Sequence, residues 1–229
     1  MLDVHNLSAA YGQSEVLHNV DFSVAPGEIV AVVGRNGMGK STLMKSLIGI
    51  IPPRSGEVKV DGKDVSTLAS HARVARGLAY VPQGRQIFGT MTVRENIETG
   101  LVVTGKTLIP HEIFVLFPIL KEFEKRRGGN LSGGQQQQLA IARALASDPK
   151  ILLLDEPTEG IQPSIIKDIS RVLRQIRDMT NMCIVVCEQL LSFVLDVADR
   201  ILVMENGRIV HSATRDGVDE AAIARFLAV

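Results

Sequence analysis

The stretch that decides the fold of this chain is GRNGMGKS at residues 34–41, which comprises Gly34, Arg35, Asn36, Gly37, Met38, Gly39, Lys40 and Ser41. It fits the pattern G-x-x-x-x-G-K-[ST] of a phosphate-binding loop. The apolar, β-branched residues ahead of it, 28–33, predict a buried strand, and residues 41–48 behind it predict a helix. This strand–loop–helix context favours a nucleotide site over the alternative, a glycine-rich turn without a ligand.

The chemistry of the loop follows from its residue types. Glycines let successive backbone N–H groups turn toward phosphate oxygens, and the helix start adds unpaired donors and the positive end of a dipole. Lys40 supplies a mobile charge for the outer phosphates, and Ser41 supplies a hydroxyl for Mg²⁺. Thr42 follows directly and completes the predicted nucleotide-binding stretch.

Composition narrows the class of protein. The 229 residues suffice for one large domain or two small ones. Lysine and arginine total 25, as do aspartate and glutamate, so the formal net charge is zero. Because domains that bind nucleic acid usually carry a basic surplus, we expect no nucleic-acid partner. No apolar run reaches the roughly 18 residues of a membrane span, and residues 1–6 lack a signal-peptide pattern, so we expect a soluble, cytoplasmic chain.

The cysteines and histidines indicate neither a disulfide nor a metal site. Cys183 and Cys187 lie four residues apart in a predicted strand, where extended geometry separates them by about 13 Å. That distance is too long for a disulfide, so both are expected to be buried thiols in a reducing compartment. The histidines show no metal-ligand spacing, and we expect surface or core positions for His5, His18, His71, His111 and His211.

Alternating runs at residues 2–7 and 16–24 predict antiparallel strands ahead of the loop, with Tyr11 in the turn between them. Tyr11 can pack beneath its own turn, or it can offer a flat face on which a nucleotide base stacks. The residue alone favours packing, and only the phosphate loop downstream makes stacking attractive. Residues 57–65, with Asp61-Gly62 at their centre, predict a second hairpin.

Gln83 stands at the end of a short predicted strand, residues 78–81. Its amide can reach a metal-bound water or cap the turn, and the residue alone favours the cap. Residues 91–146 then change to helical patterns, with a capping-box spacing at Thr92 and Glu95 and an interruption at Pro118. The phenylalanines here are expected mostly in the core, although their surplus also fits a groove for a partner helix.

A second glycine-rich helix start follows, formed by Ser132, Gly133, Gly134 and Gln135. Like the first, it is a ready anion site. Residues 151–154 are all apolar and predict a strand buried on both faces, whose end places Asp155 and Glu156 beside the phosphate loop. Asp155 can hold the Mg²⁺ shell and Glu156 can polarise an attacking water, whereas the alternative is a solvated acidic turn.

Three further elements close the chain. Residues 183–188 predict another core strand, residues 201–210 a hairpin around Asn206-Gly207, and residues 219–227 a short helix.

Four of these motifs, in their order and spacing, resemble the ATP-binding subunit of an ABC transporter: GRNGMGKS, the strand-end Gln83, LSGGQ at 131–135 and ILLLDE at 151–156. Longer stretches resemble the branched-chain amino acid and amide uptake branch, most closely its urea-type ATP-binding subunit. These stretches are YVPQGRQIF at 80–88, QQQQLAIARAL at 135–145 and DEPTEGIQPSIIKDI at 155–169.

The resemblance implies an α/β fold, the ABC nucleotide-binding domain of the P-loop NTPases, over residues 1–229. A RecA-like core with an N-terminal antiparallel β-subdomain would hold residues near 1–85 and 147–229, and a helical subdomain, 86–146, would be inserted. Tyr11 would stack on adenine, residues 34–42 would bind the phosphates of ATP, and the segment Ser132, Gly133, Gly134 and Gln135 would complete the site of a facing subunit. The implied metal set is Ser41, Gln83 and Asp155, and the implied catalytic set is Glu156, Gln83 and Gln189.

The implied partners are a second ATPase subunit of the same or another kind, integral membrane permease subunits and, indirectly, a solute-binding protein. Such a chain is peripheral on the cytoplasmic face of the inner membrane. The implied solute is urea or a short amide, with branched-chain amino acids as the alternative. A soluble, non-transport ABC ATPase is more remote, because neither two cassettes nor long inserted arms occur, and no guanine-reading Asn-Lys-x-Asp motif supports a GTPase.

Two positions depart from the family pattern. Residues 159–162 are Glu-Gly-Ile-Gln where Ser-Ala-Leu-Asp is usual, and Gln189 stands where a switch histidine is expected. A neutral amide donates and accepts hydrogen bonds but cannot take the proton-linked roles of imidazole. Our hypothesis is that hydrolysis at this subunit's own loop is weaker than at a partner's.

Overall fold

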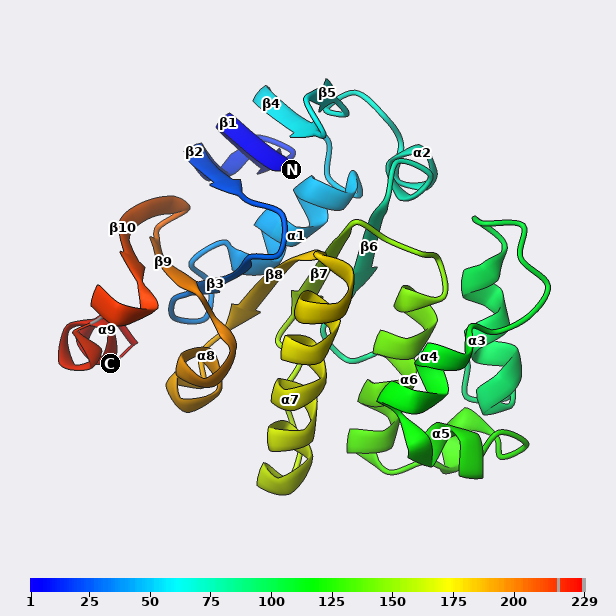
Figure 1. The fold of residues 1–229 in the computed structure, drawn as a ribbon. Coiled ribbons are helices and arrows are strands. Elements are labelled where there is room, and N and C mark those ends of the chain that lie inside the picture. The colour runs from blue at the N-terminus through cyan, green and yellow to red at the C-terminus, as the bar shows by residue number, and fades with distance from the viewer. Residues whose placement is uncertain (218, 228–229) are drawn as a thin grey trace.

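The computed structural model describes residues 1–217 and 219–227, which form two β-sheets and the helices that cover them (Figure 1). The smaller sheet has the order β2-β1-β4-β5 and is antiparallel. Its strands are β1 (Leu2–Tyr11), β2 (Ser14–Val24), β4 (Ser55–Val60) and β5 (Lys63–Asp64). Both hairpins predicted for this part of the chain are therefore confirmed.

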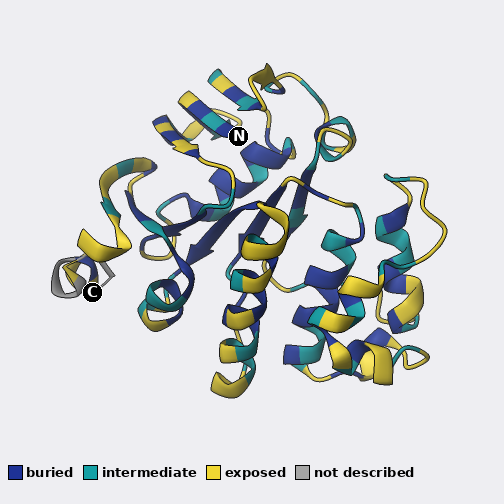
Figure 2. Cartoon of the chain, in the orientation of Figure 1, coloured by how far each residue is buried: buried dark blue, intermediate teal, exposed yellow. Residues whose placement is uncertain are grey.

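The larger sheet has the order β10-β9-β3-β8-β7-β6. Its parallel strands are β3 (Ile29–Val33), β6 (Leu78–Val81), β7 (Ile151–Asp155), β8 (Cys183–Glu188) and β9 (Arg200–Glu205). The strand β10 (Arg208–Thr214) returns antiparallel to β9 after the Asn206-Gly207 turn. Every residue of β3, β7 and β8 is buried, as expected for strands covered on both faces (Figure 2).

The helix α1 (Lys40–Ile48) lies between the two sheets and packs against both (Figure 1). One hydrophobic cluster unites it with the smaller sheet and with one face of the larger sheet, to which Leu153 and Val185 contribute. A second cluster covers the opposite face, where Leu152 and Ile184 point. The register alternates along each strand, so a single apolar run supplies both layers of the core.

Helices on the second face include α7 (Pro163–Thr180), and α8 (Leu191–Val197) covers β3 and β9. All elements between residues 93 and 145 are helical and lie beside β6 at one side of the molecule (Figure 1). They are α3 (Val93–Leu101), α4 (His111–Leu116), α5 (Pro118–Glu122), the 3₁₀ turn η1 (Gly128–Asn130) and α6 (Gly133–Leu145). The predicted capping box of Thr92 and Glu95 and the interruption at Pro118 are confirmed.

The remaining helical elements are α2 (Ser70–Val74), the 3₁₀ turn η2 (Arg215–Gly217) and α9 (Glu220–Leu227), the last of which was predicted to begin at Asp219. Cys183 and Cys187 are free, buried thiols on β8, as predicted, and burial raises the pKa of Cys183 to about 11. None of the helices in the described residues is both long and apolar enough to cross a bilayer.

Candidate active site

The phosphate loop connects β3 to α1 and has the backbone that its glycines allow. Gly37 and Gly39 have φ values of 82° and 102°, in the left-handed region that other residues rarely adopt. Gly34 approaches the adjacent strand so closely that a Cβ there would stand 2.4 Å from the carbonyl oxygen of Met204. The turn between β9 and β10 holds the loop at Met38, because the Gly207 N–H donates to the Met38 carbonyl oxygen at 2.9 Å. The loop is thus held in shape by its own sequence and by a neighbouring hairpin.

Lys40 is the first residue of α1 and its side chain is folded back into the loop. It is 4% exposed, and its Nζ donates to the carbonyl oxygens of Gly34 at 2.7 Å and Arg35 at 3.0 Å. The same ammonium stands 3.6 Å from Glu156 Oε1. Thr42, two residues further along α1, is also buried. The positive charge therefore lies inside the loop, within reach of the acidic end of β7.

Asp155 ends β7 and is almost fully buried, at 2% exposure. Ser41 Oγ donates to its Oδ1 at 3.0 Å and Tyr80 Oη donates to its Oδ2 at 3.2 Å. Burial raises the pKa of this carboxyl above its ordinary value, while the two hydrogen bonds oppose the shift. Burial and Asp155 together raise the pKa of Tyr80 as well, so its hydroxyl remains a donor. Tyr80 begins the stretch YVPQGRQIF but has no role assigned from sequence; the pairing of Tyr80 with Leu153 brings it here.

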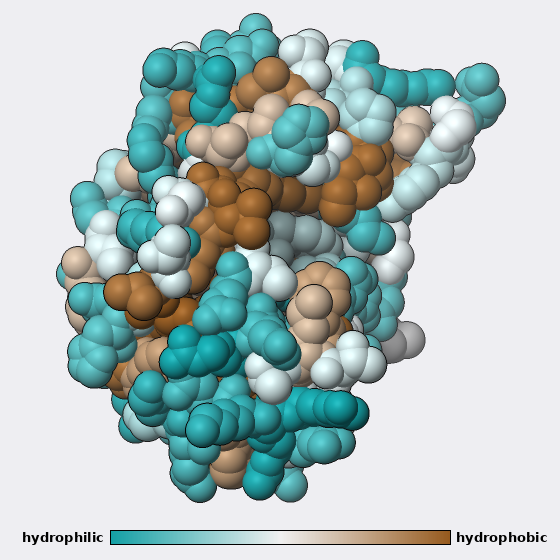
Figure 3. All heavy atoms as spheres, turned by 90° about the vertical axis from the view of Figure 1, so that its right-hand side faces the viewer, coloured by the Kyte–Doolittle hydropathy of each residue, from teal (hydrophilic) through white to brown (hydrophobic). Residues whose placement is uncertain are grey.

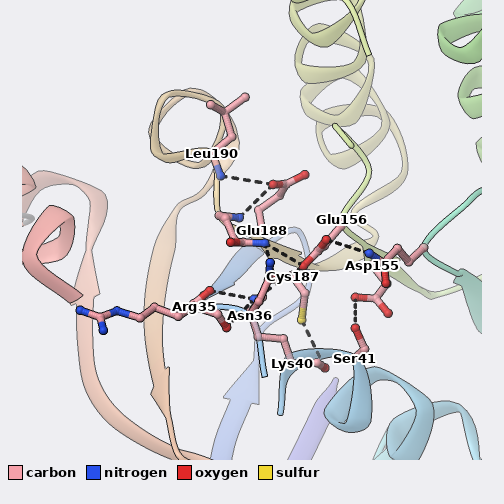
Figure 4. Close-up of polar contacts among 12 residues, drawn as sticks. Arg35, Asn36, Lys40, Ser41, Asp155, Glu156, Cys187, Glu188 and Leu190 are labelled. Atoms are coloured by element: carbon pink, nitrogen blue, oxygen red, sulfur yellow. Dashed lines mark hydrogen bonds and ion pairs between the residues drawn. The ribbon is translucent and has the colours of Figure 1, made fainter. Parts of the chain in front are cut away.

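Glu156 is in a left-handed conformation, with φ of 47°, and its N–H donates to Cys187 O at 2.9 Å. Its carboxylate accepts from Gln83 Nε2 and from Gln189 Nε2, both at 3.1 Å. Gln189 Nε2 also donates to Asn36 Oδ1 at 2.6 Å, which ties the end of β8 to the phosphate loop (Figure 4). The acidic turn considered as an alternative is thus part of an organised cluster at the ends of four parallel strands, β3, β6, β7 and β8.

Two cavities meet at this cluster. One has a volume of about 210 Å³ and is lined by the phosphate loop together with Val16, Gln83 and Glu156. The other, about 420 Å³, extends from the same place toward Thr158, Glu188 and Leu190. Asn36, Gln83 and Glu156 line both. An anionic ligand on the loop would therefore lie beside Glu156, which also borders the second cavity.

Two expectations drawn from single residues are wrong. Tyr11 is 51% exposed at the end of β1 and does not pack beneath its turn, which leaves a ring face available. Gln83 does not cap the turn after β6; its side-chain amide donates to Glu156. Gln83 meets its partner across 73 residues of sequence, which its own neighbours in sequence do not specify.

The second glycine-rich helix start lies apart from the loop. Ser132 is the N-cap of α6 and forms a reciprocal capping box with Gln135. Gly134 contacts α7 closely, since a Cβ there would stand 2.7 Å from Ile165 Cγ2, and Gly133 faces the Arg85 guanidinium. Within the described residues, no hydrogen bond or ion pair joins residues 132–135 to the phosphate loop. In the part of the chain that the structure describes, the phosphate loop is therefore an anion site to which the segment 132–135 does not contribute.

Residues 17–159 match the family described as ABC transporter. A high-affinity branched-chain amino acid transport ATP-binding protein, BraG of Pseudomonas aeruginosa, is 42% identical over 92% of this chain and 91% of its own length. A probable branched-chain amino acid transport ATP-binding protein, LivF of Archaeoglobus fulgidus, is 36% identical over 93% of this chain and 92% of its own.

The structural comparison agrees. A dimeric post-hydrolysis state of the ATP-binding cassette MJ0796, bound to ADP and Pi, superposes with a TM-score of 0.85 at 26% identity, over 95% of this chain and 100% of that one. The phosphate loop, the acidic end of β7 and the α/β architecture are thus found in a chain of which 95% aligns with such a cassette. The chain belongs to the ABC transporter family and is one of its ATP-binding, ATP-hydrolysing cassettes.

Proposed function

We propose that ATP binds between the phosphate loop of this chain and the Ser132–Gln135 segment of a facing subunit, and that Glu156 is the general base of hydrolysis. The observation that carries the proposal is the environment of the Glu156 carboxylate, which Gln83 and Gln189 hold where two cavities meet. The two amide donors orient the carboxylate and add no positive charge of their own, and the Lys40 ammonium stands 3.6 Å from its Oε1. In this proposal the exposed ring of Tyr11 stacks on adenine.

The residues around Asp155 fit Mg²⁺. The Ser41 hydroxyl and the Asp155 carboxylate are hard oxygen donors in mutual contact, and Asp155 forms no ion pair among the described residues. We propose these two as the metal-holding pair, with Gln83 beside them. When bound, the ion would neutralise charge on the phosphate oxygens, and the chain's part is to hold the donors in place.

A second cassette is proposed as the source of the missing anion site. The segment Ser132–Gln135 is a pre-formed helix start that this chain's own loop does not contact. The solved cassette that is a dimer with ADP and Pi supports two such chains facing each other. The working complex would contain two copies of this chain or this chain with a related one.

Membrane permease subunits are the proposed further partners, and the helical segment near residues 86–146 is proposed as the subdomain that meets them. A groove of about 580 Å³ runs between this segment and the β6 edge. Exposed Ile50, Phe88 and Val103 line it, and a hydrophobic band crosses this face of the molecule (Figure 3). A groove for a partner helix, considered from the phenylalanine surplus, is consistent with this surface. Through it the cassette would be held at the inner face of a membrane.

The transported solute is proposed to be a branched-chain amino acid. Two relatives of matching length bear that name, whereas a urea-type solute has only the resemblance of motifs to support it. To decide, the intact complex would be isolated with its solute-binding protein and titrated with leucine, isoleucine and valine, and then with urea and short amides. Binding of the amino acids alone is expected, and binding of urea alone would return the assignment to the urea branch.

The substitution Glu156→Gln tests the catalytic proposal. We expect ATP to bind as in the unmodified chain, while turnover falls by roughly 10²- to 10⁴-fold, the usual effect of losing a general base. ATP binding is measured by titration and turnover by phosphate release. Glu205→Gln, which changes an exposed carboxylate at the end of β9, is the matched control and should hydrolyse ATP normally. Near-normal hydrolysis by the Glu156 variant would remove that residue from the role.

A further inference from the structure

Glu188, the last residue of β8, is a buried carboxylate that none of the roles above uses. It is 3% exposed, and no lysine or arginine among the described residues forms an ion pair with it. Its Oε1 accepts from the N–H of Thr158 at 2.9 Å and from the Thr158 hydroxyl at 2.6 Å. Its Oε2 accepts from the N–H groups of Gln189 at 2.9 Å and Leu190 at 3.3 Å. Each oxygen thus binds a different loop.

The burial of the Glu188 carboxylate has an electrostatic cost that packing alone does not explain. A buried carboxylate without a cation is costly unless hydrogen-bond donors satisfy its charge, and bonds to an ionised acceptor are stronger than neutral ones. An apolar residue would fill the same space at the end of β8 without that cost. The acid is therefore best explained by what its two oxygens hold.

Strand register shows which loops these are. β8 lies between β3 and β7, with Glu188 paired to Val33 and Cys187 paired to Asp155. The loop after β7 carries Glu156 and then Thr158, and the loop after β8 begins at Gln189. Figure 4 shows Glu188 between these two segments, on the side of Glu156 away from Ser41. One side chain thus joins the backbones that carry the proposed base and the amide bonded to it.

We propose that Glu188 is a positioning residue for ATP hydrolysis: it fixes the loop of Glu156 and the loop of Gln189 to each other, so that the Gln189 amide meets the Glu156 carboxylate. The inference rests on the proposed role of Glu156. It assigns Glu188 no contact with the nucleotide. Its effect is on the rate of the chemical step rather than on ATP affinity.

Glu188→Gln is the primary variant, because it keeps the size of the side chain. A carboxamide has one acceptor oxygen and one donor group, so it can satisfy one loop but must place a donor against the N–H groups of the other. We expect kcat to fall by roughly 10- to 100-fold, the scale of a small misplacement of reacting groups, and the Kd for ATP to change by no more than about 2-fold.

A second pair of variants tests the bond to the other loop. Thr158→Val removes the hydroxyl that donates at 2.6 Å while keeping the branched shape, and Thr158→Ser restores the hydroxyl. We expect the valine variant to lose part of kcat and the serine variant to recover most of it. Ser8→Ala is a control for stability alone, because Ser8 is a buried hydroxyl on β1 bonded to Asn19. It should lower the melting temperature without lowering kcat.

The double variant Glu188→Gln with Glu156→Gln separates positioning from general damage. If Glu188 acts through Glu156, the double variant should hydrolyse ATP no more slowly than Glu156→Gln alone, since residues that act as a unit are non-additive. Multiplied losses, or a Kd for ATP that rises as much as kcat falls, would overturn the inference. Normal turnover by Glu188→Gln, with Glu156→Gln inactive, would overturn it while leaving the proposed base in place. Normal turnover by Glu156→Gln would instead count against the proposed function.

Discussion

The amide of Gln189 is bonded on two sides, to Asn36 in the phosphate loop and to Glu156 after β7. Both of these bonds use Nε2, so the two hydrogens of the amide are spent on holding the proposed base and the loop together. A neutral imidazole at this position could donate to only one of these acceptors but could exchange a proton, whereas the amide donates to both and exchanges none. The geometry thus shows what glutamine does at the position where the resemblance leads us to expect a switch histidine.

Gln189→His tests whether the amide limits hydrolysis. We expect turnover to rise several-fold above about pH 7 and to fall as pH drops through about 6.5, because a protonated imidazole beside Glu156 would lower the basicity of that carboxylate. Phosphate release between pH 5.5 and 8.5, in the assembled transporter, is the measurement. Unchanged turnover across this range would leave the hypothesis of a weaker site without support.

Several site residues could be predicted from sequence because their signal is local. The glycines, Lys40 and Ser41 lie within eight residues, and the acidic pair follows an apolar strand directly. Two contacts around those groups could not be predicted. Tyr80 reaches Asp155 only through the pairing of β6 with β7, and Glu188 reaches Thr158 across 30 residues of sequence. Such contacts depend on strand order and register, which periodicity alone does not specify.

The helix α1 depends on a residue outside its own sequence. Arg73 of α2 is 1% exposed and donates to the carbonyl oxygens of Ser46 and Leu47 at the end of α1, both at 2.8 Å. It also donates to Leu68 O at 3.0 Å and to Ser66 O at 2.6 Å. A cation at the negative end of a helix dipole, bonded to its free carbonyls, stabilises that end. Burial lowers the pKa of the guanidinium below its ordinary value.

Arg73→Met should therefore destabilise the fold. The side chain keeps its length but leaves buried carbonyl oxygens without donors, and we expect a loss of about 3 kcal/mol in the free energy of unfolding. Urea denaturation is the measurement. Arg76→Met, which changes an exposed arginine two residues beyond the same helix, is the control and should stay within about 0.5 kcal/mol. A similar, small change for both variants would show that the four bonds contribute little.

The elements themselves were largely predictable. Strand β7 and helix α6 have strong apolar patterns and recognisable starts, and both were located from residues 151–156 and 131–135. The stacking of the smaller sheet on α1 was not predictable from pattern, because it depends on contacts between segments that the phosphate loop separates in sequence.

This chain has two glycine-rich helix starts, at α1 and at α6, and they do not contact each other in the described residues. The phosphate loop at α1 is surrounded by the ends of β7 and β8, whereas the start of α6 packs against Arg85 and α7. In the proposed function these are the two halves of one ATP site, which only a second molecule can then complete. In a symmetric pair, each loop would face the α6 start of the other chain, so both sites would form at once.

Mixing two inactive variants tests this arrangement. Lys40→Ala removes the charge of the loop, and Ser132→Phe blocks the start of α6, so each variant alone should lack turnover. In a mixed dimer one site carries both defects and the other carries neither. Random pairing makes half of the dimers mixed, so an equimolar mixture should recover up to about a quarter of the unmodified turnover. A mixture as inactive as its components, with dimers present by light scattering, would contradict a shared site, as would normal hydrolysis by Ser132→Phe alone.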